Sequence, residues 1–392
     1  MRAIKPSFVK LPLVIFFAAC FWSCDKTSSI TTLSANTSQT NFSGPTNILF
    51  VGSSDNNFYA LDALTGKLKW KYTGGGWFSY ANPAVYNGVV YTGCTDNNVY
   101  ALDIATGNLK WKYSTGGSIE SSLSVINGVV YVGSDDYNMY SLDATTGNLN
   151  WKFSTGANVS SSPAVLNGIV YFGSSDANVY ALNINNGSLV WKFTTGAMIN
   201  QSGVAISNGT IFVGSRDDNL YAIDAATGNL KWNYNTNGIS LEESSPAVAN
   251  GIVYIGGWYN VPLFNVGGNV YAIDETSGNL VWQSLNSLGF SSSPYISNNI
   301  LYISADDGNF YALNSSTGNV VWKSYILPNG AKSIASNGIV YVGGGGTHYI
   351  YAFDAASGNV VWKFAVGSNG LDTSSPCVIE NDGTIINPGN SN

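Results

Sequence analysis

The side chains in this sequence that could carry chemistry are repeated carboxylates. One set of six precedes a Thr-Gly or Ser-Gly pair by three residues, and a second set of six occurs in short polar turns. Carboxylates at fixed spacing can bind Ca²⁺ or act as general acids and bases. In turns they also accept hydrogen bonds from backbone amides. Because both sets recur at one repeated position, and no Asp-x-Asp calcium loop is present, we interpret them as turn-stabilising residues. The first set is Asp62, Asp103, Asp143, Asp224, Asp274 and Asp354, and the second is Asp55, Asp96, Asp136, Asp176, Asp217 and Asp307.

The remaining reactive residues do not form a recognisable catalytic pattern either. His348 is the only histidine, which excludes a His-rich metal centre and argues against a Ser-His-Asp triad. The glycine run 343–346 before it does not open a helix, so it is not a phosphate-binding loop. Cys94 and Cys377 occupy non-equivalent positions, and we interpret both as small buried residues rather than a disulfide. We therefore expect no catalytic residue, no metal site and no cofactor.

The elements that carry these residues are internal repeats. The segment Ala60–Trp70 has the pattern Ala-x-Asp-x-x-Thr-Gly-x-x-x-Trp, and it occurs eight times with small changes. Its tryptophans lie 40 or 41 residues apart, except for a gap of 50 between Trp232 and Trp282. Such a period indicates a repeat fold in which recurring residues have structural roles. The tryptophans are Trp70, Trp111, Trp151, Trp191, Trp232, Trp282, Trp322 and Trp362.

Each repeat contains four short apolar runs separated by turn residues. In the second repeat these are Val89–Gly93, Val99–Asp103, Asn108–Tyr113 and, leading into the third, Ser122–Ile126. The run Asn108–Tyr113 alternates, so we expect Leu109 with its tryptophan on a buried face and the lysines in solvent. Asn-Gly pairs recur at one turn of the repeat, with Asn298-Asn299 and Asp382-Gly383 as close substitutes, and they are strong predictors of tight hairpins. They are Asn87-Gly88, Asn127-Gly128, Asn167-Gly168, Asn208-Gly209, Asn250-Gly251 and Asn337-Gly338.

Four antiparallel strands per repeat, without helical periodicity, predict an all-β fold: an eight-bladed β-propeller of four-stranded blades. The ends of the array predict how the ring closes. The first repeat begins at Ile48–Gly52 with no strand ahead of it, whereas the last repeat is followed by an extra run, Ser375–Ile379. We expect this C-terminal strand to join the first blade, which would leave no open sheet edge between the two ends.

The N-terminus predicts export. Basic residues precede the apolar run Leu11–Phe21, and Cys24 follows this run after Trp22 and Ser23. This pattern is similar to bacterial lipoprotein signals, with Cys20 as an alternative lipidation site and an ordinary secretory signal as an alternative reading. We expect a signal peptide at 1–23, a lipidated Cys24 with a flexible tether at 24–46, the propeller at 47–386 and a tail at 387–392. With a net charge of −7 and only 10% charged residues, the chain lacks the basic surface that nucleic acids require.

The Ala-x-Asp-x-x-Thr-Gly-x-x-x-Trp pattern resembles the repeat of the PQQ-type eight-bladed propellers over about residues 47–383. In that family the tryptophan docks each blade's outer strand onto its neighbour. The family includes quinoprotein dehydrogenases, which carry an adjacent-cysteine disulfide, calcium ligands and a catalytic aspartate, and non-catalytic scaffolds. The resemblance is nearer to the scaffolds, especially the propeller lipoprotein of the outer-membrane β-barrel assembly machinery. It implies a bacterial cell envelope location at the outer membrane, periplasmic or surface-exposed, with attachment to the membrane through the lipid anchor only.

Function is expected where the repeat is irregular. The sixth repeat inserts residues 257–268, and the loop at 73–80 is unusually aromatic. The loop at 237–246 is similar to the partner-binding loop of the assembly-machinery propeller, although it lacks that loop's arginine. Aromatic loop residues are favoured interface anchors, although they can also pack locally over the blades. The predicted protein-partner contacts are Trp77, Phe78, Tyr80, Leu241, Glu242, Trp258, Tyr259, Phe264 and Phe290.

The first hypothesis is therefore a non-catalytic scaffold that binds protein partners at the envelope. An alternative is a carbohydrate or small-ligand receptor, since aromatic loops around a Ser/Asn-lined channel can stack on sugars. A third, less favoured, is a PQQ-dependent dehydrogenase.

Overall fold

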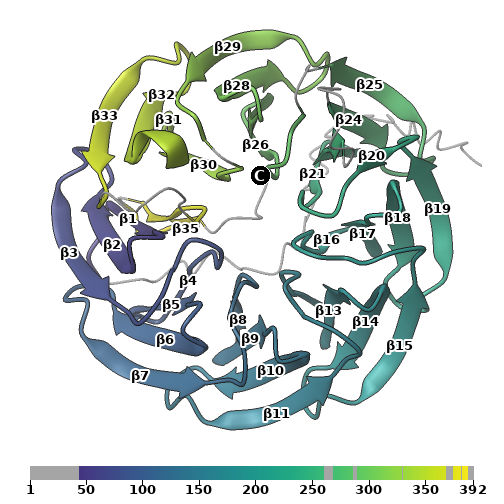
Figure 1. Cartoon of the computed structure of the whole chain (residues 1–392), viewed down its shortest axis with the longest axis horizontal. Coiled ribbons are helices and arrows are strands. Elements are labelled where there is room, and N and C mark those ends of the chain that lie inside the picture. The colour runs from purple at the N-terminus through teal and green to yellow at the C-terminus, as the bar shows by residue number, and fades with distance from the viewer. Residues whose placement is uncertain are drawn as a thin grey trace, which may run out of the picture. The chain divides into compact units, whose positions relative to one another are not determined.

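The computed structural model describes residues 44–259, 268–285, 289–328, 330–367, 374–380 and 382–386. Eight β-sheets are arranged in a ring as the blades of a propeller (Figure 1). Seven sheets have four antiparallel strands and one has five, which confirms the predicted all-β eight-bladed fold. We number the blades 1 to 8 in the order in which their outer strands occur in the chain.

Each blade has an inner, a second, a third and an outer strand. In blade order, the inner strands are β34 (Cys377–Ile379), β4 (Ala84–Tyr86), β8 (Ser124–Ile126), β12 (Ala164–Leu166), β16 (Ala205–Ser207), β21 (Ala247–Ala249), β26 (Tyr295–Ser297) and β30 (Ser333–Ser336). The second strands are β1 (Ile48–Gly52), β5 (Val89–Gly93), β9 (Val129–Gly133), β13 (Ile169–Ser174), β17 (Thr210–Gly214), β22 (Ile252–Gly256), β27 (Ile300–Ser304) and β31 (Ile339–Gly344). The third strands are β2 (Asn57–Asp62), β6 (Asn98–Asp103), β10 (Asn138–Asp143), β14 (Asn178–Asn183), β18 (Asn219–Asp224), β24 (Asn269–Asp274), β28 (Asn309–Asn314) and β32 (Tyr349–Asp354).

The outer strands form the rim of the ring. They are β3 (Leu68–Thr73), β7 (Leu109–Ser114), β11 (Leu149–Ser154), β15 (Leu189–Thr194), β19 (Leu230–Asn235), β25 (Leu280–Leu285), β29 (Val320–Tyr325) and β33 (Val360–Ala365). Four short elements lie outside this plan: β20 (Ile239–Ser240), β23 (Trp258–Tyr259), β35 (Ile385–Ile386) and the 3₁₀ helix η1 (Gly345–Thr347).

The ring is closed by strands from both ends of the propeller. Strand β34 pairs antiparallel with β1, and Phe50 lies opposite Cys377 in this pairing. The predicted C-terminal closure is therefore confirmed. The sequence did not predict β35, which pairs with β34 and makes blade 1 five-stranded.

The hairpin turns follow from their residues. In the turn between β4 and β5, Asn87 and Gly88 have φ of 45° and 74°, the two positive values that a type I′ turn requires. Asparagine tolerates this left-handed conformation better than other residues with a Cβ, and glycine adopts it without strain. The prediction of tight hairpins at the Asn-Gly pairs is confirmed.

One expectation about the outer strands is wrong. The alternation in the sequence predicts Leu109 on the buried face with Trp111, but its side chain is 43% exposed. The register between β6 and β7 shifts at Ala101/Leu102. Ala101 pairs with Trp111 across the two strands, but Leu102 pairs with Leu109, so Lys110 is skipped. Such a bulge places two residues against one and changes which face the next side chain occupies. The same shift occurs between the third and outer strands of every blade.

The core lies between neighbouring blades rather than within one sheet. Phe50, Phe58 and Trp70 of blade 1, for example, pack against Val90 and Leu102 of blade 2 in one buried cluster. Each blade is therefore stabilised by the next, as expected for a repeat array. Within the part of the chain that the structure describes, no helix has the length and apolar character needed to cross a membrane.

Candidate functional site at the variable face

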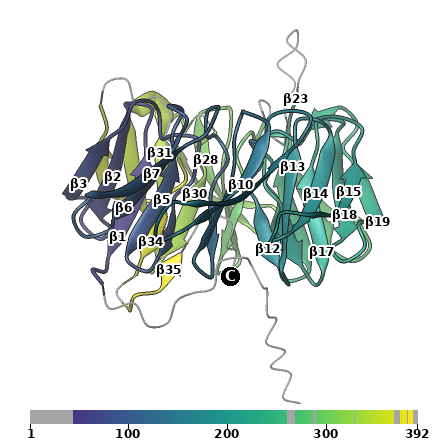
Figure 2. The same ribbon diagram turned by 90° about the horizontal axis from the view of Figure 1, so that it is seen from below.

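The two faces of the propeller carry different connections. The constant face carries the Asn-Gly turns and the Thr-Gly turns, which are similar in every blade. The variable face carries the turns between second and third strands and the loops from each outer strand to the next inner strand. The ribbon of β20 and β23 also lies on the variable face (Figure 2), with Ile239 opposite Tyr259 and Ser240 opposite Trp258. Differences between repeats are thus concentrated on one face.

The repeated tryptophans join each blade to the next. The indole N–H of Trp70 donates a hydrogen bond to the carbonyl oxygen of Ile104 in blade 2, and Trp362 donates to Ala63 across the closure. All eight such bonds are 2.8 to 3.0 Å long. A glycine of the next blade covers each ring; a Cβ at Gly107 would lie 2.6 Å from Trp70. The tryptophan and the Thr-Gly turn thus form one interblade joint.

The repeated carboxylates are held in turns. Asp143 accepts hydrogen bonds from the backbone and side chain of Thr146, and these bonds lower the pKa of Asp143. The second set links blades: Asp96 accepts the hydroxyl of Tyr100 at 2.6 Å and the backbone N–H of Gly75, from the preceding loop, at 2.9 Å. The interpretation of these aspartates as turn residues is confirmed.

Three of the predicted partner contacts are buried instead. The side chains of Phe78, Leu241 and Phe290 are 0%, 0% and 2% exposed. Each closes the end of a blade at a position that Ile119, Val159 and Ile199 occupy in other loops. Each of these residues packs against the glycine at the end of a second strand, where a Cβ would clash. A Cβ at Gly52 would lie 2.6 Å from the Phe78 Cβ, and a Cβ at Gly214 would lie 2.8 Å from the Leu241 Cβ. A Cβ at Gly256 would lie 2.6 Å from the Phe290 carbonyl oxygen. We therefore remove these three residues from the candidate interface.

Glu242, a fourth predicted partner contact, is also buried. Its side chain is 5% exposed, and Oε1 lies 3.6 Å from Nε of Arg216. Burial raises the pKa of Glu242, and the arginine opposes this shift. Glu242 therefore holds the loop at 237–246 against blade 5, and it does not face a partner.

Two of the predicted aromatic residues pack against each other, and one of them is exposed. The Trp77 side chain is 45% exposed, and its ring centroid lies 6.3 Å from that of the half-buried Tyr80. The backbone around Trp77 is fixed, because its N–H donates to Oγ1 of Thr95 at 2.8 Å. The pair is thus presented by an ordered loop between blades 1 and 2.

The other aromatic candidates belong to the insertion in blade 6. Trp258 is partly buried, and its indole N–H has no hydrogen-bond partner among the described residues. The structure places the backbone of Tyr259 in β23, whereas Phe264 lies outside the described residues. Since blades 2 and 6 are four steps apart in a ring of eight, the Trp77 and Trp258 loops flank the channel from opposite sides.

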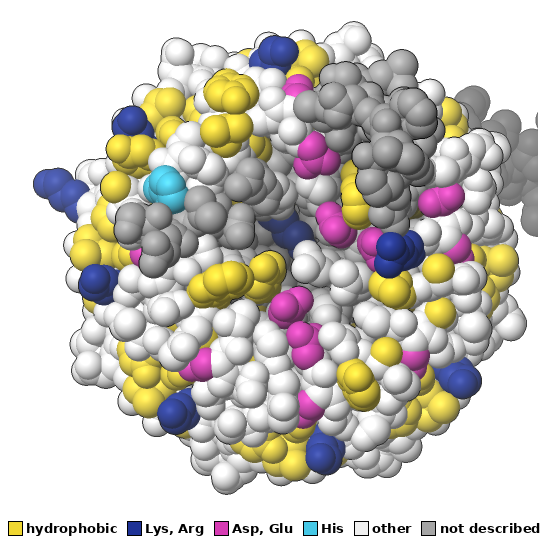
Figure 3. Space-filling view, viewed as in Figure 1, with side chains coloured by type: hydrophobic (Ala, Val, Ile, Leu, Met, Phe, Trp, Pro, Cys, Tyr) yellow, Lys and Arg dark blue, Asp and Glu magenta, His cyan; other side chains and the backbone are white. Residues whose placement is uncertain are grey.

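Between these loops lies a polar cavity of about 220 Å³, the channel mouth. Figure 3 shows acidic side chains around the hollow centre of this face, in which a basic side chain is visible. Six lining residues are each the fourth residue before an inner strand, so one position of the repeat points into the channel. They are Tyr80, Glu120, Ser160, Gln201, Glu243 and Ser291. Lys332, directly before β30, completes the charged lining.

The pKa values of the charged groups in the channel mouth differ from those of the same groups in water. Burial, with a contribution from Asp135, raises the pKa of Glu120 to about 7. Burial and then the charge of Glu242 raise the pKa of Glu243 to about 7. Burial lowers the pKa of Lys332 to about 8. Sequence inspection missed these residues, and the signal that could have found them is their common offset from the inner strands.

The fold and the interblade joints define the class of this protein: an eight-bladed propeller of the PQQ-like type. A profile of the family described as outer membrane protein assembly factor BamB matches residues 22–128, 117–260 and 266–387. The chain belongs to this family.

Solved structures show the same fold at low sequence identity. BamB from Moraxella catarrhalis has a TM-score of 0.65 at 17% identity, covering 78% of this chain and 95% of that one. The computationally designed Ika8 protein has a TM-score of 0.66 at 19% identity, covering 82% and 94%. Quinohemoprotein alcohol dehydrogenase ADHIIG from Pseudomonas putida HK5 has a TM-score of 0.62 at 17% identity, covering 79% of this chain and 69% of that one. No curated protein sequence matches the chain.

The dehydrogenase neighbours raise the question of whether the channel suits a quinone cofactor with its metal ion. Within the described ranges, no three His, Cys, Asp or Glu side chains are grouped so that they could hold a metal. Cys94 and Cys377 are both buried and form no disulfide with each other, as interpreted from the sequence. The described residues do not supply the metal ligands that this cofactor uses, and no reaction step is derived through it.

Proposed function

We propose that this chain is a non-catalytic scaffold lipoprotein of the cell envelope, which binds a protein partner in outer-membrane protein assembly. Membership of the BamB family and the propeller fold support a scaffold role. The observation that carries the partner-binding proposal is the exposed Trp77, held with Tyr80 on the variable face by an ordered backbone. A large exposed aromatic ring on a rigid loop is typical of interface anchors.

The partner surface comprises the loop with Trp77 and Tyr80 and the opposite ribbon with Trp258. Attachment to the membrane occurs through a lipidated Cys24 and the tether at 24–46, of which residues 24–43 lie outside the described residues. A partner that spans both loops covers the channel mouth.

Photocrosslinking in the native cell tests this surface. A benzoylphenylalanine at position 77 is expected to crosslink to a component of outer-membrane β-barrel assembly, identified by mass spectrometry. The matched control is position 109 on the rim, because Leu109 is 43% exposed and Trp77 45%. Equal crosslinking of that component from both positions would contradict the proposal.

Binding is tested separately by co-purification. The double substitution Trp77→Ala and Trp258→Ala is expected to reduce recovery of the same partner, whereas Leu109→Ala leaves it unchanged. Thermal melting of both variants shows whether the fold is kept. Unaltered recovery with the folded double variant would refute the assignment of this surface.

Two further measurements address the anchor and the absence of catalysis. Mass spectrometry of the mature N-terminus is expected to show a lipid on Cys24, and Cys24→Ser is expected to release the protein from membranes. Titration with the quinone cofactor and Ca²⁺ is expected to give no saturable spectral change. A lipid on Cys20, or saturable cofactor binding, would overturn the respective part of the proposal.

A further inference from the structure

The channel mouth contains three charged side chains that do not neutralise one another. Glu120, Glu243 and Lys332 line the same cavity, but none belongs to the four ion pairs found among the described residues. Their side chains also make no hydrogen bond within the described part of the chain. A charge removed from bulk water without a partner costs free energy, so such groups mark a place where a ligand could supply the missing partners.

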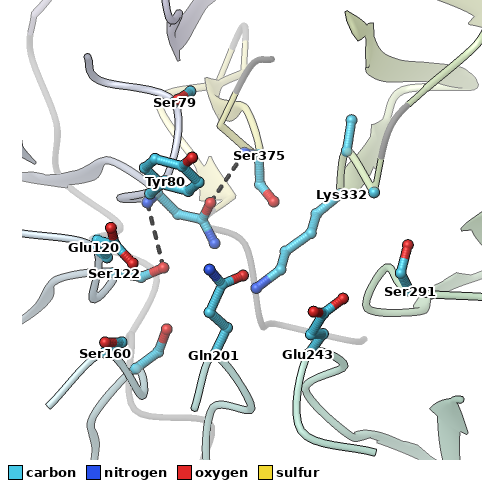
Figure 4. Close-up of a pocket in the computed structure, with 14 residues that line it drawn as sticks. Ser79, Tyr80, Glu120, Ser122, Ser160, Gln201, Glu243, Ser291, Lys332 and Ser375 are labelled. Atoms are coloured by element: carbon cyan, nitrogen blue, oxygen red, sulfur yellow. Dashed lines mark hydrogen bonds between the residues drawn. The ribbon is translucent and has the colours of Figure 1, made fainter. Parts of the chain in front are cut away.

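The positions of these charges are asymmetric. Figure 4 shows Lys332 and Glu243 pointing inward from one side of the cavity and Glu120 lying on the opposite side. Lys332 and Glu243 share the cavity but lie beyond ion-pair distance of each other, since no pair within 4 Å joins them. A ligand that carries a carboxylate next to an ammonium can bridge these two groups. Glu120, on the opposite side of the cavity, then remains as a partner for a second ammonium of the same ligand.

The rest of the lining suits a small polar molecule. Gln201, Ser160 and Asn82 offer amide and hydroxyl groups, and Tyr80 adds an aromatic wall. Several lining groups are already fixed: Ser375 donates its backbone N–H to Oδ1 of Asn82 at 2.9 Å. A cavity of about 220 Å³ is large enough for one amino acid.

We propose that the channel mouth binds a free basic amino acid, with L-lysine as the reference ligand. Its α-carboxylate contacts Lys332, its α-ammonium contacts Glu243, and its side-chain ammonium contacts Glu120. The two positive groups and one negative group of the ligand complement the two negative groups and one positive group of the site. This site shares Tyr80 with the proposed protein-partner surface, but its three charged contacts are not part of that surface.

Isothermal titration calorimetry of the whole protein with three probes tests the site without any substitution. L-Lysine is expected to bind saturably. L-Norleucine, which lacks the side-chain ammonium, and cadaverine, which lacks the carboxylate, are each expected to bind at least about tenfold more weakly, because each leaves one charged group unpaired. Absence of L-lysine binding at millimolar concentration, or equal affinity for all three probes, would overturn the proposal.

Substitutions assign the contacts. Lys332→Met is expected to weaken L-lysine binding by about tenfold or more, and Glu120→Gln is expected to remove the preference for L-lysine over L-norleucine. The control is Lys363→Met, because Lys363 lies on the rim, with its ammonium 4.4 Å from the Tyr349 ring centroid. Lys332→Gln replaces Lys332→Met if the latter does not fold. Unchanged L-lysine affinity in folded Lys332 and Glu120 variants would refute the assignment.

A lysine side chain of a protein partner could occupy the same cavity, and one further probe separates the two ligands. Nα-Acetyl-L-lysine methylamide has the side-chain ammonium but neither of the charged α-groups. It is expected to bind at least about tenfold more weakly than L-lysine. Equal or tighter binding of this probe would reject the free amino acid in favour of a partner's side chain.

Discussion

The interblade joint between Trp191 and Gly228 allows a sharp test of what holds the propeller together. The Trp191 indole N–H donates to the carbonyl oxygen of Ala225 at 3.0 Å, and its ring lies 5.7 Å from that of Tyr171. Gly228 has φ of 75°, and a Cβ there would lie 2.7 Å from the Trp191 ring. The joint thus combines a hydrogen bond, an aromatic contact and a close approach that only glycine permits.

The magnitudes follow from these contacts. Trp191→Ala is expected to lower the free energy of unfolding by about 3 kcal/mol, the lower end for a buried tryptophan, because this ring is partly exposed. By itself, Gly228→Ala is expected to lower the free energy of unfolding by about 1 kcal/mol for the left-handed backbone and by about 2 kcal/mol for overlap with the Trp191 ring. In the Trp191→Ala background only the backbone cost remains, so the two substitutions should couple by about 2 kcal/mol.

Urea denaturation followed by far-ultraviolet circular dichroism measures these differences without relying on Trp191 fluorescence. Gly209→Ala is the matched control: Gly209 has φ of 68°, but a Cβ there would meet no atom within 4 Å. It is expected to cost about 1 kcal/mol in both backgrounds. Additivity of Gly228→Ala and Trp191→Ala, or a coupling equal to that of the control, would refute the steric reasoning.

Three further predictions concern charge, thiols and closure. Burial lowers the pKa of Lys332 from 10.5 to about 8. The whole destabilising effect of its ammonium is therefore present below pH 8, and the free energy of unfolding should rise as the pH increases from about 8 to 10.5. Lys332→Met should stabilise the protein at pH 7 by on the order of 2 kcal/mol and flatten this rise in urea denaturation; an unchanged pH profile would contradict the assignment. Burial raises the pKa of the Cys94 thiol to about 12, so neither Cys94 nor Cys377 should react with a thiol reagent until urea unfolds the protein. Deletion of residues 374–392 removes β34 and should abolish the cooperative unfolding transition; retention of the full melting temperature would show that closure is dispensable.

Much of the architecture could be predicted because it rests on short-range chemistry repeated eight times. The Asn-Gly turns require positive φ, which those residues adopt readily, and the missing inner strand of the first repeat matches the extra strand at the end of the array. The aspartates were correctly interpreted as turn residues for the same reason, since Asp62 and Thr65 lie only three residues apart. Each of these predictions depends on neighbours in the sequence or on the count of repeats.

The errors concern side chains whose surroundings come from another blade or strand. Leu109 is exposed because a bulge between β6 and β7 changes its face, and alternation within one strand does not reveal a bulge. Phe78 and Phe290 are loop residues in the sequence, yet glycines at the ends of β1 and β22 leave the space that buries them. A loop residue's burial depends on how closely a distant segment approaches.

The number of blades, their strands, the closure of the ring and the residues of the interblade joints follow from the sequence. Which loop side chains are exposed and which line the channel mouth depends on the tertiary structure. Glu120, Glu243 and Lys332 are separated by more than eighty residues from one another along the chain, and they line one cavity because ring closure places their loops around a common axis. Local turn chemistry is encoded within a repeat, whereas a central site exists only once all eight repeats have closed.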